Sequence, residues 1–289
     1  MHAPIVCLGE TLWDVLPHGA FLGGAPFNVA AHLARLGAPV CLVSRVGADA
    51  RGREALARMR AVGLGTARVQ VDPWLPTGEA RAVLDGTGSA RYEFPSPAAW
   101  DRIEADAHAL EAANGASALV FGTLSQRTPA AVEAVRRLVD AACWRVLDLN
   151  LRAPHDQRDV ALASLARADF VKLNDSEADR VAAWLGVAAD PPDLLDVLAA
   201  RFGVASLCIT RGERGAVLWH DGQWFDQPAA RSEVIDTVGA GDAFLAMLLA
   251  ELLDGRAPAT AMERAARLAA FVASQPGAVP DYAAGDFRG

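Results

Sequence analysis

Lysine is almost absent from this sequence, since Lys172 is the only one among 289 residues. A Walker A phosphate-binding loop needs a lysine directly after its last glycine. Lys172 instead lies in Phe170-Val-Lys-Leu-Asn174, with no glycine-rich loop before it. The chain is therefore not a P-loop kinase.

Basic residues as a group are also in deficit, with 27 Lys and Arg against 35 Asp and Glu and a formal net charge of −8. Nucleic acids and anionic membranes are bound through a basic face, so neither is expected as the main partner. No apolar run approaches the roughly 20 residues of a membrane span, and the first residues lack the basic and apolar regions of a secretory signal. We expect a cytoplasmic protein.

Cysteine is sparse and scattered. The four cysteines lie far apart, mostly in apolar runs, and no CxxC pair occurs. A zinc site or a redox motif is therefore not expected, and buried reduced thiols are. With 52% hydrophobic and 21% charged residues, the composition is that of a globular protein.

Short apolar runs alternate with longer segments of helical period, which predicts a mainly parallel central sheet flanked by helices in one α/β domain, 1–289. The expected strands are 4–8, 40–46, 118–121, 145–149, 170–173 and 206–210. The expected helices are 26–36, 51–62, 129–142, 176–184, 194–202, 240–253 and 259–273. Gly37 and Gly63 fall where helices should end.

Two stretches break this rhythm and predict a small β lid, inserted from about 11–21 and 69–100. Within the second, Thr77 to Gly88 has the pattern of a strand followed by a turn.

A glycine motif near the C-terminus, Asp236-Thr-Val-Gly-Ala-Gly-Asp242, precedes an apolar helix. Gly239 and Gly241 would let the backbone approach an anion, and the new helix offers unpaired N–H groups. A carboxylate at this anion hole can accept the proton of an attacking hydroxyl while the amides stabilise a transferred phosphoryl group. Asp242 is thus a candidate base. The alternative is that this motif only starts a helix and that Asp242 is a capping residue.

A second glycine motif, Gly23-Gly-Ala-Pro-Phe-Asn28, opens an earlier helix, and Asp14 follows the first strand closely. Ligands bind beyond the carboxyl ends of strands in open parallel sheets. Asp14 and Asn28 together suit a polyol, because they can accept from and donate to neighbouring hydroxyls. Asp14 alone is also typical of a turn.

The two motifs, in this order and about 200 residues apart, resemble the two signatures of the ribokinase-like (PfkB) carbohydrate kinases. The resemblance runs from Gly9 to Pro280. The segments that most resemble bacterial fructokinases are Gly9-Glu-Thr-Leu-Trp-Asp14, Gly24-Ala-Pro-Phe-Asn28, Tyr92-Glu-Phe94 with Ala99-Trp-Asp101, and Asp148-Leu-Asn-Leu-Arg152.

The resemblance implies that Asp242 is the catalytic base and that Gly239, Ala240 and Gly241 form the anion hole for the γ-phosphate of ATP. It implies that the sugar is held by Asp14, Gly23, Gly24, Asn28 and Arg152. Arg152 as an ordinary surface arginine is the alternative, and this chain has Leu149 where the family usually has proline.

For the nucleotide, the resemblance implies Asn174 and Glu177 as the pair that organises water around Mg²⁺, and Thr210, Arg211, Gly212 and Gly215 as the nucleotide-binding turn. One Asn and one Glu are sufficient for this role, because Mg²⁺ keeps several of its waters and takes few direct protein ligands. Asn174 and Glu177 also fit a capping box, and residues 210–215 also fit a plain β-hairpin turn.

The family likeness further implies that 269–278 forms a wall of the adenine pocket, and that Asp236 and Val238 contribute to a K⁺ site made largely of backbone carbonyls. In this family the lid covers the sugar and often forms a dimer, for which Trp74, Tyr92, Phe94 and Trp100 are the aromatic candidates. Packing of these side chains onto the body is the alternative.

We therefore expect an ATP- and Mg²⁺-dependent sugar kinase that converts fructose to fructose 6-phosphate. The rival substrates are ribose, 2-keto-3-deoxygluconate and nucleosides. A dinucleotide-binding oxidoreductase is disfavoured because no Gly-x-Gly-x-x-Gly follows the first strand. A catalytically silent sugar-binding protein is the remaining alternative.

Overall fold

The computed structural model describes residues 3–16, 19–84 and 90–288. A large sheet runs through this part of the chain in the order β13-β12-β11-β10-β9-β8-β1-β4-β5. From β5 to β11 neighbouring strands are parallel, and β12 and β13 are antiparallel at one edge. The bounds are β1 Ile5–Leu8, β4 Val40–Gly47, β5 Val69–Asp72, β8 Ala118–Phe121, β9 Arg145–Asp148, β10 Phe170–Asn174, β11 Ser206–Thr210, β12 Ala216–His220 and β13 Gln223–Gln227.

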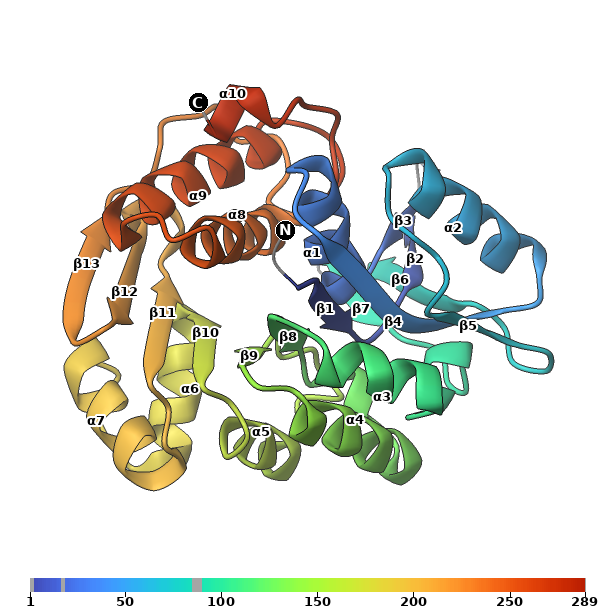
Figure 1. The fold of residues 1–289 in the computed structure, drawn as a ribbon, viewed down its shortest axis with the longest axis horizontal. Coiled ribbons are helices and arrows are strands. Elements are labelled where there is room, and N and C mark those ends of the chain that lie inside the picture. Colours follow the sequence, from blue (N-terminus) through green and yellow to red (C-terminus); the bar gives the residue numbers. More distant parts are fainter. Residues whose placement is uncertain (1–2, 17–18, 85–89, 289) are drawn as a thin grey trace.

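Helices cover both faces of this sheet, as Figure 1 shows. One face carries α1 Ala25–Arg35, α2 Ala50–Ala61, α8 Ala240–Leu253, α9 Pro258–Ala273 and α10 Gly285–Arg288. The other carries α3 Ala107–Asn114, α4 Pro129–Ala141, α5 Arg158–Leu165, α6 Asp175–Leu185 and α7 Pro191–Phe202. Along β1, Ile5 and Cys7 join the first core while Val6 and Leu8 join the second, because successive side chains of a strand point to opposite faces.

The predicted α/β class is confirmed, and the six expected strands and seven expected helices form within about three residues of their predicted bounds. Gly37 and Gly63 follow the ends of α1 and α2 with positive φ, as expected of helix C-termini. The thiols of Cys7 and Cys208 are buried, but Cys143 is exposed, contrary to expectation. Among the described residues, no helix combines the length and apolarity that crossing a bilayer requires.

Two parts of the large sheet differ from the prediction. Residues 69–72 form β5, which pairs in parallel with β4 instead of joining the lid, because β4 extends to Gly47 and leaves an edge for it. The hairpin of β12 and β13 was not predicted. Its turn, Asp221-Gly222, has φ of 49° and 78°, the pattern that favours Asp-Gly in a two-residue hairpin loop.

The segments predicted as a lid contribute to a second, four-stranded sheet in the order β3-β2-β6-β7, which is called the lid below. Its strands are β2 Leu12–Leu16, β3 Gly19–Gly23, β6 Gly78–Leu84 and β7 Ala90–Glu93. The lid expected up to residue 100 ends earlier, since Ala99–Arg102 is a short 3₁₀ helix in which Trp100 is fully buried. The turn expected at residues 85–88 lies outside the described residues.

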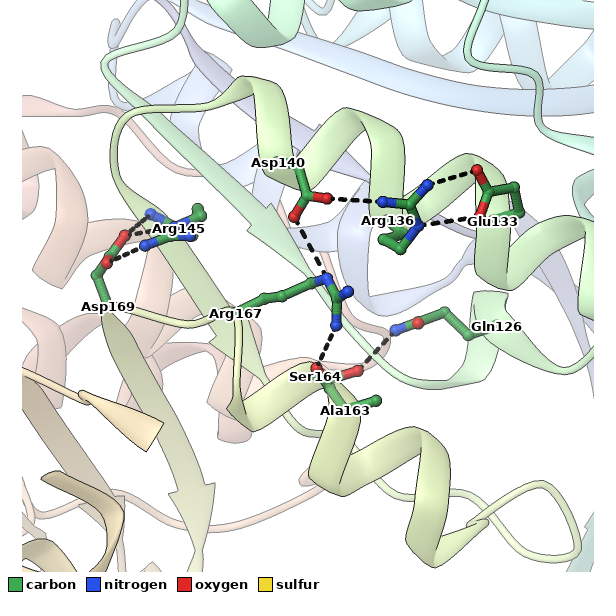
Figure 2. Close-up of polar contacts among 9 residues, drawn as sticks. All are labelled: Gln126, Glu133, Arg136, Asp140, Arg145, Ala163, Ser164, Arg167 and Asp169. Carbon is green, nitrogen blue, oxygen red and sulfur yellow. Dashed lines mark hydrogen bonds and ion pairs between the residues drawn. The ribbon is translucent and has the colours of Figure 1, made fainter. Parts of the chain in front are cut away.

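Polar contacts join the helices on the second face (Figure 2). Arg167, just after α5, reaches Asp140 of α4, which also binds Arg136. These side chains are partly exposed, so each pair contributes little. The buried contact is that of Gln126, whose Nε2 donates to Ser164 Oγ of α5 and to the carbonyl of Gly122.

A buried ion pair attaches the end of the lid to the body. Arg127 donates to both carboxylate oxygens of Asp101 and to the carbonyls of Phe94 and Pro95, and its guanidinium lies 3.7 Å from the ring centroid of Trp100. The two side chains are 1% and 3% exposed. The segment that follows β7 is therefore fixed to the start of α4.

We expect Arg127→Met to lower the free energy of unfolding by about 3–5 kcal/mol, because it leaves the buried carboxylate of Asp101 without its cation. Urea denaturation measures the loss. Arg136→Met on the exposed face of α4 is the matched control and should change stability by less than about 0.5 kcal/mol. Equal effects of the two variants on stability would contradict the assignment of Arg127 and Asp101 as a buried ion pair.

Candidate active site

A cleft of about 1050 Å³ lies between the lid and the carboxyl ends of β1, β9, β10 and β11. Residues from the ends of these strands, from the first turns of α1 and α8, and from β2 and β7 of the lid line it. This is the position at which open parallel sheets bind ligands. The fold thus collects segments that are far apart in the sequence.

The first turn of α8 forms the floor of the cleft at Gly239, Ala240, Gly241 and Asp242. Gly239 caps the helix with φ 80°, and a β-carbon there would lie 2.6 Å from atoms of Ala278. Glycine is required at this position for both reasons. Because the first amides of a helix have no partner within the helix and carry partial positive charge, this turn can hold an anion.

Helix α1 meets α8 at the candidate base. Asn28 Nδ2 donates to Asp242 Oδ2 at 2.8 Å, across 214 positions of sequence. Asn28 is 4% exposed, and its Oδ1 has no partner among the side chains and backbone that the structure describes. The two motifs predicted to act together are in direct contact.

The surroundings raise the pKa of Asp242 to about 6. Burial is the main cause and the carboxylate of Asp148 adds to it, while Lys172, the amide of Asn28 and Arg152 act in the opposite direction. A carboxyl group with such a pKa is mostly ionised at neutral pH and is a stronger base than an ordinary aspartate.

Lys172 was considered above only as evidence against a P-loop, yet it lines the cleft. Its Nζ donates to Asp148 Oδ1 at 2.8 Å, and a β-carbon on Gly241 would lie 3.5 Å from it. Burial favours a lower pKa for Lys172, but Asp148 and Glu177 outweigh burial and raise it. The cation therefore lies beside the helix turn that can hold an anion. The sequence feature that could have identified Lys172 as a cleft residue is a lone lysine within an otherwise apolar, buried strand.

Glu10 is a second residue that the sequence reasoning missed. It follows β1, lines the cleft and is 2% exposed. Burial raises its pKa to about 7, against the lowering effects of its own N–H, the N–H of Ala25 and Arg152. The sequence signal for it was a carboxylate two residues after a fully buried strand, at the carboxyl edge of the sheet.

The predicted sugar residues come together at the lid end of the cleft. Asp14 of β2, Gly24, Asn28 and Arg152 line it, joined by Tyr92 of the lid. Burial raises the pKa of Asp14 to about 6, Arg152 lowers it, and Asp236 raises it.

Gly23 does not line the cleft, contrary to its predicted place among the sugar contacts. A β-carbon on Gly23 would lie 2.2 Å from Asp14 Oδ2. Its role in the structure is to leave room for that carboxylate.

At the other end of the cleft, Asn174, Thr210, Gly212 and Gly215 line the wall as expected. Arg211 does not, because it pairs with Asp226 of β13.

Two structural alternatives were given for this end of the cleft, a β-hairpin turn at 210–215 and a capping box formed by Asn174 and Glu177, and the structure shows both. Residues 210–215 connect the antiparallel strands β11 and β12. Asn174 and Glu177 form the capping box of α6, and Glu177 accepts from the backbone N–H of Asn174 and of Leu151. Glu177 is buried and lies behind the cleft wall. Its contact with water around Mg²⁺ stays a prediction.

Of the segment predicted as a wall of the adenine pocket, Ala269, Ala270 and Ala273 of α9 line the cleft, and their contact with adenine stays a prediction. Val238 also lines it, whereas Asp236 does not, and Asp236 Oδ1 accepts from the N–H of Val238. The K⁺ site expected near these two residues stays a prediction.

Comparison with known proteins gives concordant results. The profile of the pfkB family of carbohydrate kinases matches residues 19–283. A fructokinase of Rhizobium leguminosarum bv. trifolii is 31% identical over 270 residues, which cover 86% of this chain and 79% of that protein. A 2-dehydro-3-deoxygalactonokinase of Haloferax volcanii is 28% identical over 302 residues and covers 94% of this chain and 91% of its own length.

Among solved structures, a fructokinase of Xylella fastidiosa with bound ATP superimposes with a TM-score of 0.82 at 24% identity, covering 96% of this chain and 94% of its own. A putative ribokinase II of E. coli in complex with ATP and Mg²⁺ gives a TM-score of 0.86 at 21% identity, with 99% and 98% coverage. The likeness to these structures establishes the fold.

The raised pKa of Glu10 predicts a pH-dependent effect of Glu10→Gln on stability. The folded protein binds this proton more tightly than the unfolded chain does, so wild type loses stability as the pH rises from about 4.5 to 7. The loss is about 3 kcal/mol and is absent from the variant. Chemical denaturation at pH 4 and pH 8 should show the stability of the variant relative to wild type improving by that amount. A difference that is independent of pH would contradict the burial of an ionisable Glu10.

Proposed function

Because the chain belongs to the pfkB family of carbohydrate kinases, we propose that it transfers the γ-phosphoryl group of ATP to a primary hydroxyl of a small neutral sugar, with fructose to fructose 6-phosphate as the leading assignment. The observation that carries this proposal is the Asn28–Asp242 contact at the start of α8, on the floor of the cleft. The cleft is at the upper end of the usual range for small-molecule sites, which suits two substrates together.

In this proposal Asp242 accepts the proton of the sugar hydroxyl. As the hydroxyl oxygen bonds to the γ-phosphorus, the bond from that phosphorus to the β-phosphate oxygen breaks, and ADP leaves with those electrons. The hydrogen bond from Asn28 holds one carboxylate oxygen in place, so the other oxygen can face the hydroxyl. The raised pKa makes the carboxylate a competent base near neutral pH.

The amides of Gly239, Ala240 and Gly241 would stabilise the charge on the transferred phosphoryl group, and Lys172 would add a full positive charge beside them. Lys172 is well placed for this because Asp148 already fixes its ammonium group. In a buried site such fixed charges act more strongly than in water.

Mg²⁺ would accompany ATP and would offset the phosphate charge. It takes few direct protein ligands and keeps several waters. Asn174 and Asp175 line the cleft and could bind those waters, while the carboxylate of Glu177 lies behind them and fixes the start of α6. The donor set is therefore compatible with a Mg²⁺ ion that is bound mainly by phosphates and water.

The charges at the lid end favour a neutral sugar over a sugar acid. Among the described residues, Arg152 is the cation that interacts with the carboxyl groups of Glu10, Asp14 and Asp242 at this end, and it lowers the pKa of each. A carboxylate on the substrate would have to compete with these groups for one guanidinium. A polyol needs only donors and acceptors, which Asp14 and Asn28 supply.

The lid would cover the bound sugar and exclude water, which prevents wasteful hydrolysis of ATP. Asp14 of β2 and Tyr92 of β7 place lid side chains in the cleft. Trp74, beside the lid, is 84% exposed, and a homodimer formed through the lid stays a prediction. The catalytically silent alternative is disfavoured by the complete Asn28, Asp242 and Lys172 arrangement.

Asp242→Asn is the direct test of the base. The variant keeps an oxygen that can accept from Asn28 but cannot take up the proton, so kcat should fall by about 10²–10⁴. ADP release measures kcat, and calorimetry should show sugar affinity close to that of wild type. Asp140→Asn on the surface of α4 is the control and should keep wild-type kcat. An unchanged kcat in Asp242→Asn would remove Asp242 from the mechanism.

A substrate screen tests the sugar. ADP release is compared for fructose, ribose, 2-keto-3-deoxygluconate and a nucleoside at equal concentrations with MgATP. We expect the highest kcat/KM for fructose, because the pocket offers polyol partners and little spare positive charge. A strong preference for ribose or for the sugar acid would overturn the fructose assignment while leaving the kinase assignment intact.

A further inference from the structure

His32 lies in α1 one helical turn after Asn28, and its side chain is completely buried. Nε2 of its ring is 2.9 Å from the carbonyl oxygen of Ala278, and Nδ1 is 2.9 Å from the hydroxyl of Tyr282. Both partners lie in the segment between α9 and α10. A buried histidine with both nitrogens bonded is held in one orientation.

The partners determine the tautomer. A carbonyl oxygen can only accept, so Nε2 carries the hydrogen and donates to Ala278. Nδ1 then accepts from the hydroxyl of Tyr282. Burial lowers the pKa of His32 to about 4, against the raising effect of the Ala278 carbonyl, so the ring is neutral at physiological pH, as this arrangement requires.

Ala278 is the residue that lies against Gly239. A β-carbon on Gly239 would lie 2.6 Å from its Cα, Cβ and carbonyl oxygen. Helix α1 therefore reaches the first turn of α8 twice: Asn28 bonds Asp242 directly, and His32 holds the backbone that supports Gly239 from the outside.

We propose that His32 is a positioning residue for phosphoryl transfer, which acts through Ala278 to fix the left-handed conformation of Gly239. That conformation sets the direction of the amides at Gly239, Ala240 and Gly241 relative to the Asp242 carboxylate. The inference rests on the proposed function, because those amides matter only if they bind the transferred group. Misplacement of catalytic groups by about 1 Å can reduce rates about 100-fold.

Two substitutions separate the Nε2 bond from the packing of the ring. His32→Leu removes the donor, and we expect kcat to fall about 10- to 100-fold while the KM for the sugar changes less than about twofold. His32→Gln places an amide N–H at about the position of Nε2 and should restore most of kcat. Leu33→Val, in the same helix and equally buried, is the control for general loss of stability and should keep the kcat of the folded fraction.

A readout that does not depend on activity accompanies the kinetics. Hydrogen exchange of the backbone amides of 237–242 should be faster in His32→Leu than in wild type, and close to wild type in His32→Gln and Leu33→Val. If wild type phosphorylates no sugar, the proposed function fails, yet the exchange result still tests the link from His32 to Gly239. His32→Leu with kcat within twofold of wild type and unchanged exchange at 237–242 would overturn the inference.

Discussion

The hydrogen bond from Asn28 to Asp242 is the contact on which the candidate site depends. It joins the first turns of α1 and α8, which belong to opposite ends of the chain and pack on the same face of the large sheet. Apolar packing brings the two helices together but is not directional. The amide of Asn28 supplies the direction, because it fixes one oxygen of the carboxylate and leaves the other for a substrate.

Carboxyl groups outnumber cations in this cleft, and that imbalance gives the site its chemistry. Glu10, Asp14 and Asp242 each have a raised pKa because burial disfavours their charged forms. Lys172 and Arg152 moderate this effect without removing it. Asp148 has the further role of holding Lys172, so the lysine is fixed before any phosphate arrives. The fold thus accepts an electrostatic cost at the place where the proposed reaction needs both a base and a phosphate-binding cation.

Much of the fold was predictable because its strands are short apolar runs between long, periodic helices, some of which are ended by glycines such as Gly37 and Gly63. The pairing of β5 with β4 was not, because which edge a short strand joins is decided by tertiary contacts. At the cleft, Gly24, Asn28 and 239–242 lie where the glycine motifs predicted, whereas Glu10 and Lys172 were not predicted to line it. Lys172 lies within one buried strand and Glu10 lies just beyond another, and only the sheet order shows that they face the same cleft. Gly23 and Arg211 were assigned to ligands because they lie in the motifs. In the structure Gly23 leaves room for the Asp14 carboxylate, and Arg211 pairs with Asp226.

The Gly-Ala-Gly-Asp motif shows why local sequence alone is ambiguous. Gly239 is needed for its positive φ, which any helix cap of this kind would require, and also for the close approach of Ala278, which no local pattern reveals. The second requirement depends on the segment after α9, and that segment is attached to α1 through His32. The same Gly-Ala-Gly-Asp sequence at the start of a helix without contacts from α1 and from the segment after α9 would form only a helix cap. The proposed catalytic role of Asp242 therefore depends on contacts with α1 and with residues 278–282. These contacts form only when the whole domain has folded.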